Sequence, residues 1–210
     1  NHYYNKDFAI LYRTNAQSRS FEEALRKLNI PYKIYGGLSF YQRKEVKDFI
    51  SYLRVVVNPN DEEALKRIIN YPVRGIGNTS IDRLIVTANE HDLPLWHVVE
   101  KPEIINDMQA RAKQLIRDFS IMIKSFRAML AGKNAYEIAE YIGKQTGLIQ
   151  DLYKDKTPEG ISRFENIQEL LNGIKEYTVG EQPEYEEDEV KPENDLAAYL
   201  QQISLLTDMD

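Results

Sequence analysis

The sequence predicts a mostly α-helical protein that begins with a small α/β part. Two observations carry this prediction: residues 7–37 follow a strand–helix–strand order, and from residue 45 onward apolar residues recur at helical spacing. Strand–helix–strand is the repeating unit of parallel α/β sheets, but these residues hold too few strands to complete a sheet. We therefore expect the 210 residues to be a piece of a larger protein.

Two short runs of apolar and β-favouring side chains predict the strands, at residues 7–13 (DFAILYR) and 32–37 (YKIYGG). The first is expected to be buried, and a pair of glycines stops the second. Between them, residues 20–29 (SFEEALRKLN) carry apolar side chains at helical spacing and end at Asn29.

The rest of the chain is expected to be helical. Apolar residues recur at helical spacing in each segment, and Asn134 is placed to cap one of them. The acidic, proline-interrupted stretch at 179–194 is interpreted as a flexible loop. The expected helices cover residues 45–58, 62–70, 80–90, 104–131, 135–147, 161–177 and 195–206.

Composition excludes several classes of protein. The chain has no cysteine, which excludes disulfides and thiolate metal sites, and its three histidines are too scattered to suggest a zinc site. No apolar run is long enough to cross a bilayer, and no signal peptide opens the chain. We therefore expect a soluble, cytoplasmic protein with no membrane partner.

The net charge of −6 is unevenly distributed along the chain. Residues 181–195 carry eight acidic residues and one lysine, whereas residues 1–54 carry ten basic and five acidic residues. The acidity is therefore local, and the N-terminal part has the mildly basic balance that favours phosphate binding. An ordinary solvated surface is the other interpretation of the same charges.

The segment YPVRGIGNTS (residues 71–80, the glycine hairpin) lies between two expected helices. Gly75 and Gly77 can take positive φ angles and approach another surface closely, so the amides of residues 75–77 can point outward together. The next helix begins near Asn78 and adds unpaired amides, while Ile76 is expected to pack inward. Such a hairpin can hold a phosphate backbone without reading a sequence. The alternative is a tight helix–helix connection without a ligand.

The segment YRTNAQSR (residues 12–19, the Arg13 loop) directly follows the first expected strand. Ligands gather beyond the carboxyl ends of strands in open parallel sheets. Arg13, Thr14, Asn15, Gln17 and Arg19 would place two charges and three polar groups there, which suits phosphate and sugar contacts. A loop with ordinary capping residues explains the segment as well.

A third segment, GGLSFYQRKEVKDFISYLR, combines an aromatic pair with a basic helix start. Phe40 and Tyr41 can stack on bases, although aromatic residues in such positions are more often in the core. Arg43 and Lys47 form a possible track for DNA phosphates. Ion pairs with neighbours such as Glu45 are the alternative for these cations.

No catalytic constellation is found in the sequence. It has no G-x-x-x-x-G-K-[ST] phosphate loop, no carboxylate pair at a strand end to hold Mg²⁺, and no Ser-His-Asp or H-E-x-x-H arrangement.

Three segments in order, ILYRTNAQSR, GGLSFYQRKEVKDFISYLRVVVNPND and RIINYPVRGIGNTS, resemble successive stretches of the second half of UvrD/PcrA/Rep helicases. The close match covers about residues 7–90. SRFENIQELL and DLAAYLQQISLLTD are similar to late helices of the same family. These helicases are superfamily 1 motors that use ATP and Mg²⁺ to move along single-stranded DNA from 3′ to 5′.

The resemblance implies a division of the chain into part of the second RecA-like motor domain (residues 1–58) and a helical inserted domain (residues 59–206). It places single-strand contacts at Arg13, Thr14 and Asn15. It places duplex contacts ahead of a fork in a helix-hairpin-helix-like Gly-Ile-Gly loop, at Gly75, Ile76 and Gly77, with Arg74, Asn78 and Thr79 adjacent.

The same resemblance implies that the parent helicase, acting in DNA repair or replication, is the enzyme. This piece lacks the Walker motifs and is expected to be inactive alone and to bind no cofactor; its partners would be DNA and the rest of the helicase chain. Ser39 departs from the family, where relatives can carry a basic residue, so a phosphate contact there is in doubt. The rival hypotheses are a stand-alone helix-hairpin-helix DNA-binding module and a helical protein-interaction domain.

Overall fold

The computed structural model describes residues 3–180 and 195–207, so most of the acidic stretch expected to form a loop lies outside the described residues. The described part is mostly helical, as predicted. Its α-helices are α1 Ser18–Lys27, α2 Lys44–Val57, α3 Glu62–Ile68, α4 Asn78–Glu90, α5 Leu95–Glu100, α6 Ala110–Arg127, α7 Ala135–Gln145, α8 Leu148–Lys154, α9 Pro158–Val179 and α10 Asp195–Thr207. Its 3-10 turns are η1 Asn5–Asp7, η2 Asn15–Gln17, η3 Phe40–Gln42 and η4 Pro102–Ile104.

The two predicted strands do not form in the described part of the chain, which contains no strand. Residues 8–12 follow η1 outside any helix or strand, and their apolar side chains face solvent: Phe8 is 68% exposed and Leu11 94%. A strand is held by hydrogen bonds to a neighbouring strand, and no segment among the described residues supplies one. The small α/β part is therefore not confirmed, and the expectation that residues 7–13 are buried is wrong for this structure.

Helix α2 lies at the centre of the helical core. It packs against α3, α6, α7, α9 and α10. Its largest side chains, including Phe49, Tyr52 and Leu53, are fully buried, and the polar Glu45 and Asp48 are buried with them. A helix covered on nearly every side must satisfy its polar groups through partner side chains, and this requirement shapes the site described below.

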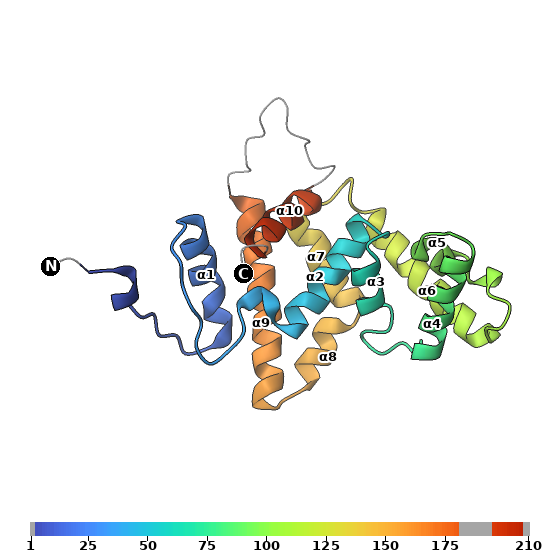
Figure 1. Cartoon of the computed structure of the whole chain (residues 1–210), viewed down its shortest axis with the longest axis horizontal. Helices are drawn as coiled ribbons and strands as arrows, with labels where there is room; N and C mark the ends of the chain where they lie inside the picture. The colour runs from blue at the N-terminus through green and yellow to red at the C-terminus, as the bar shows by residue number, and fades with distance from the viewer. Residues whose placement is uncertain (1–2, 181–194, 208–210) are drawn as a thin grey trace, which may run out of the picture.

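The helices form an elongated arrangement in which α1 lies at one end and α4, α5 and α6 at the other (Figure 1). Helices α2, α7 and α9 lie between them, and η1 extends beyond α1 (Figure 1). The segments preceding α1 and the hairpin between α3 and α4 are therefore separated along the long axis of the molecule.

The predicted cap at Asn134 is confirmed, and α7 begins at the next residue as expected. Asn134 accepts a hydrogen bond from the backbone amide of Glu137 at 2.9 Å, and the Glu137 carboxylate accepts one in return from the Asn134 amide at 3.2 Å. The helix predicted over residues 104–131 forms over a shorter range, as α6. Helices α5 and α8, of six and seven residues, were not predicted.

Candidate nucleic-acid interface

The glycine hairpin joins α3 to α4, and its two glycines have different conformations. Gly75 has φ of +80°, in the left-handed region that glycine favours. Gly77 has φ of −73° and ψ of 163°, which other residues adopt readily, and it is the N-cap residue of α4. A Cβ on Gly77 would meet no atom within 4 Å. The expected positive φ is therefore confirmed at Gly75 only, and Gly77 leaves open space in front of the start of α4.

Asn70, just after α3, organises the hairpin. Its side-chain oxygen accepts hydrogen bonds from the amide of Arg74 at 2.9 Å and from the amide of Ile76 at 3.1 Å. The Ile76 amide thus points into the loop, which corrects the expectation that it points outward with its neighbours. The sequence signal for this role was an asparagine at the end of a helix, directly before a turn, where asparagine often bonds the following backbone.

Four amides of the hairpin, those of Gly75, Gly77, Asn78 and Thr79, are left free at the surface of the part of the chain that the structure describes. The Ile76 side chain is fully buried, as predicted, and anchors the loop to the core. Gly75, Gly77, Asn78 and Thr79 are exposed, and among the described residues no acceptor is found for their amides. The amides of Asn78 and Thr79 belong to the first turn of α4, where the helix dipole favours an anion.

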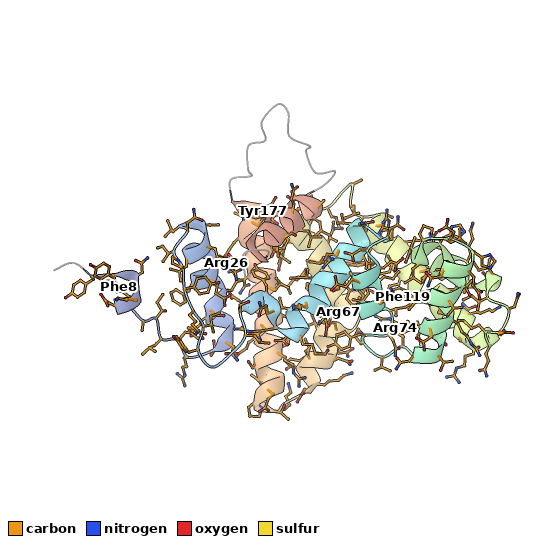
Figure 2. The ribbon with its side chains drawn as sticks, viewed as in Figure 1. Phe8, Arg26, Arg67, Arg74, Phe119 and Tyr177 are labelled. Carbon is orange, nitrogen blue, oxygen red and sulfur yellow. The ribbon has the colours of Figure 1, made fainter. Side chains whose placement is uncertain are left out.

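Arg74 turns back into the protein. Its guanidinium donates to the carbonyls of Ile68 at 3.2 Å and Pro72 at 3.0 Å and to the hydroxyl of Tyr52 at 2.5 Å. It also lies 5.6 Å from the ring centroids of Tyr52 and Phe119, and Figure 2 shows Arg74 next to Phe119. In this structure Arg74 supports the hairpin from behind.

Tyr52 completes this support from the middle of α2. Its hydroxyl donates to the carbonyl of Tyr71, the first residue of the hairpin, while it accepts from Arg74. Burial raises the pKa of Tyr52, and Arg74 opposes that shift only in part. The phenol therefore stays neutral and keeps its hydrogen for Tyr71.

The Arg13 loop is shaped by Gln17, whose side-chain oxygen accepts from the amides of Arg13 at 2.9 Å and Thr14 at 3.1 Å. The Arg13 side chain is exposed and has no acidic partner among the described residues. Asn15 is exposed and its amide nitrogen donates to the hydroxyl of Ser162 on α9 at 3.4 Å. The loop therefore presents one free charge and two small polar side chains.

Arg43 holds the Arg13 loop in place. It is buried, and its guanidinium donates to the Asn15 carbonyl at 2.6 Å, the Asn166 side chain at 2.9 Å and the Ser18 hydroxyl at 2.8 Å. Burial lowers its pKa, and the nearby Glu22 carboxylate opposes this shift. Arg43 therefore positions the loop against α9 and is turned away from solvent. Asn166, which the sequence did not single out, is part of this arrangement.

Arg19 is also directed inward. Its guanidinium forms an ion pair within α1 with Glu23 at 3.0 Å, and its pairs with Glu169 at 2.9 Å and Glu176 at 2.8 Å tie α1 to α9. Burial lowers the pKa of Arg19, but the three carboxylates outweigh burial and raise it above the ordinary value. Arg19 is thus committed to holding two helices together.

In the third segment the two aromatic side chains lie in the core and a lysine lies at the surface. Phe40 and Tyr41 are buried, and the Tyr41 hydroxyl donates to Glu23 at 2.6 Å, so neither ring is available to stack on a base here. Lys47 is exposed on α2, and no partner for its ammonium is found among the described residues.

The free amides and the exposed charge of these loops have the chemistry that suits an anion. Within residues 3–180 and 195–207, no set of three histidine, aspartate or glutamate side chains is placed to share a metal ion. None of the helices in that part of the chain is both long and apolar enough to span a membrane. Two exposed polar loops remain: the half-buried Arg74 supports the glycine hairpin, and the buried Arg43 supports the Arg13 loop.

Comparison with known proteins identifies a family and several relatives with similar sequences. A family model described as the UvrD-like helicase C-terminal domain matches residues 1–210. The chain is 36% identical over 204 residues to the ATP-dependent DNA helicase PcrA of Leuconostoc citreum, and 35% identical over 204 residues to DNA helicase II of Haemophilus influenzae. It is 36% identical over 205 residues to the ATP-dependent DNA helicase PcrA of Staphylococcus aureus. These matches cover 97%, 95% and 98% of the chain but 27%, 26% and 27% of the relatives, so the chain spans about a quarter of their length.

Proposed function

Because the chain belongs to the UvrD-like helicase C-terminal domain family, we propose that it is the DNA-holding part of a 3′–5′ ATP-dependent DNA helicase. The glycine hairpin holds duplex DNA ahead of a fork, and the Arg13 loop holds the single strand. The names of the relatives support DNA as the ligand and ATP as the fuel of the parent. On this proposal residues 1–58 belong to the motor domain and residues 59–206 to the helical insertion.

The outward amides of the glycine hairpin carry the proposal for duplex binding. Gly77, Asn78 and Thr79 present successive amides from a loop that Ile76, Asn70 and Arg74 fix from inside. Backbone amides at a helix start bind phosphate oxygens regardless of base sequence. A site of this kind suits a helicase, which must move along any sequence.

The Arg13 loop supplies the complementary contact with single-stranded DNA. Arg13 offers an exposed, unpaired guanidinium, and Thr14 and Asn15 offer short polar side chains beside it. Arginine binds phosphate through two parallel hydrogen bonds, so one free arginine is sufficient to fix a backbone at this point.

ATP and Mg²⁺ are assigned to the parent and not to this chain. The sequence has no phosphate loop, and the described residues offer no cluster for a metal ion. The residues present therefore do not fit the nucleotide. We expect the purified chain to show no DNA-stimulated release of phosphate from ATP, because the lysine that stabilises the transferred phosphoryl group is absent.

We expect the chain to bind DNA weakly and without sequence preference. Few phosphates are contacted, so the logarithm of the binding constant should fall with the logarithm of salt concentration with a slope of about −2 to −4. Fluorescence anisotropy with labelled duplex and single-stranded DNA of two unrelated sequences measures this slope. Binding that ignores salt or strongly prefers one sequence would contradict the proposal. A protein-interaction domain would bind neither DNA.

Replacing Gly77 with aspartate separates the hairpin's DNA contact from its stability. Aspartate is a preferred N-cap residue, the φ of −73° suits it and its Cβ has open space, so the thermal midpoint should stay equal or rise. Its carboxylate would occupy the first-turn amides of α4 and repel phosphate, so duplex affinity should fall by about tenfold, equivalent to about 1.4 kcal/mol.

Two matched variants complete this test. Gly77→Asn caps the helix without the charge and should weaken duplex binding less than Gly77→Asp. Arg13→Ala should weaken single-strand binding by about 1–2 kcal/mol, while Lys27→Ala, which removes an exposed charge on α1, should not. If Gly77→Asp folds and binds duplex like the wild type, the hairpin is only a structural turn.

A further inference from the structure

A stripe of side chains along α6 runs beneath the glycine hairpin and out to the surface. Phe119, Leu115 and Arg111 follow each other at intervals of four residues, so they share one face of the helix. Phe119 lies under the Arg74 guanidinium, and a Leu115 methyl lies 3.4 Å from the place of a Cβ on Gly75. The hairpin thus lies along this face of α6. Arg111 is the next position on the same face after Leu115, the residue that lies against Gly75.

Burial along the stripe decreases toward Arg111. Phe119 is 1% exposed, Leu115 is partly buried and Arg111 is exposed. Four residues of helix advance about 6 Å along the axis, so Arg111 lies about one turn past the contact between Leu115 and Gly75. An exposed arginine on a different helix therefore lies about one turn from the place where α6 meets the hairpin.

The charged neighbours of Arg111 are already engaged. Arg83 donates to the Asp107 carbonyl, Arg117 pairs with Glu103, and Lys113 donates to the Glu103 carbonyl at 3.4 Å. The acidic side chains on the adjoining surfaces are Asp82 on α4, Asp107, Asp118 on α6 and Glu103. Among the described residues, none of these carboxylates pairs with Arg111, and its guanidinium has no acceptor.

We propose that Arg111 is a second phosphate contact of the duplex site, which binds the same DNA that the amides of Gly77, Asn78 and Thr79 hold. This inference rests on the proposed function of the hairpin and extends it from one loop to two helices. The forked guanidinium suits a phosphate, and its free donors are not used by the fold. Two attachment points on one duplex fix its orientation, which a single loop cannot do.

Replacing Arg111 with glutamine in the whole chain tests the contact. We expect the slope of log binding constant against log salt for a fluorescein-labelled duplex to become shallower by about 0.9, the value for one phosphate. Duplex affinity should fall several-fold and equally for two unrelated sequences, while single-strand binding and the thermal midpoint stay unchanged. Lys133→Gln removes an exposed charge from the loop before α7 and serves as the charge-matched control.

The outcomes separate the inference from the proposed function. An unchanged slope for Arg111→Gln, together with weakened duplex binding by Gly77→Asp, would overturn the role of Arg111 and leave the hairpin site standing. Equal losses for Arg111→Gln and Lys133→Gln would also overturn it, because a general charge effect would explain both. Absence of duplex binding by the wild type, or normal binding by Gly77→Asp, would count against the hairpin itself.

Discussion

Replacing Arg19 with methionine is expected to destabilise the chain by about 3–5 kcal/mol, the usual cost of removing one partner from a buried ion pair. The Arg19 side chain is 4% exposed, whereas its partners Glu23 and Glu169 are 19% and 23% exposed, so both would remain largely desolvated without a cation. Because Arg19 joins α1 to α9, the loss should appear as separation of α1 before the rest of the fold opens.

Urea denaturation followed by circular dichroism measures this loss, and hydrogen exchange in α1 shows whether that helix opens first. Gly173→Ala provides an independent probe, because a Cβ there would lie 2.7 Å from the Arg19 guanidinium. Alanine normally stabilises a helix relative to glycine by about 1 kcal/mol, so a destabilised Gly173→Ala would reveal the close approach. Lys27→Met on the exposed face of α1 is the control. An unchanged midpoint for Arg19→Met would contradict the prediction.

Replacing Arg74 with alanine is expected to cost about 2–4 kcal/mol of stability, since it removes hydrogen bonds to a charged group and two cation–π contacts. The Tyr52 hydroxyl and the carbonyls of Ile68 and Pro72 would lose their donor. Arg74→Lys should recover only part of this loss, because an ammonium cannot reach all three acceptors as the planar fork does.

The same denaturation measurement distinguishes two roles for Arg74. If Arg74 mainly contacts DNA, Arg74→Ala will keep its unfolding midpoint and lose duplex affinity alone. The structure leads us to expect a lowered midpoint, with weaker duplex binding as a consequence of a loosened hairpin. Arg111→Gln, which removes an exposed arginine on α6, should leave the midpoint unchanged and is the matched control.

Local patterns were sufficient to predict most of the helical fold. The apolar spacing of residues 45–58 marked α2, because a helix of four turns repeats its pattern often enough to be recognised. The cap at Asn134 and the inward side chain of Ile76 were also predictable, since both depend on neighbours within a few residues. The strand predicted at residues 7–13 does not form in the described part of the chain, because a strand depends on a partner that its own sequence does not specify.

The direction of the arginine side chains could not be predicted from the sequence. Arg19, Arg43 and Arg74 all stand in segments that are typical of phosphate binding, yet all three turn inward. Glu169 and Asn166, partners of Arg19 and Arg43, lie more than a hundred residues away along the chain, and Tyr52, a partner of Arg74, lies 22 residues away. Only the packing of α9 and α2 decides which cations support the loops and which, like Arg13, remain available to a ligand.

The residues that support the two loops lie at the start and in the middle of α2, and this arrangement has a mechanical consequence. Arg43, at its start, fastens the Arg13 loop, and Tyr52, nine residues later, fastens the glycine hairpin through Arg74. Nine residues of helix span about 13 Å, and an intact helix barely changes its length. On the proposed function, a push on a duplex held at the hairpin would be transmitted along α2 to a single strand held at the Arg13 loop.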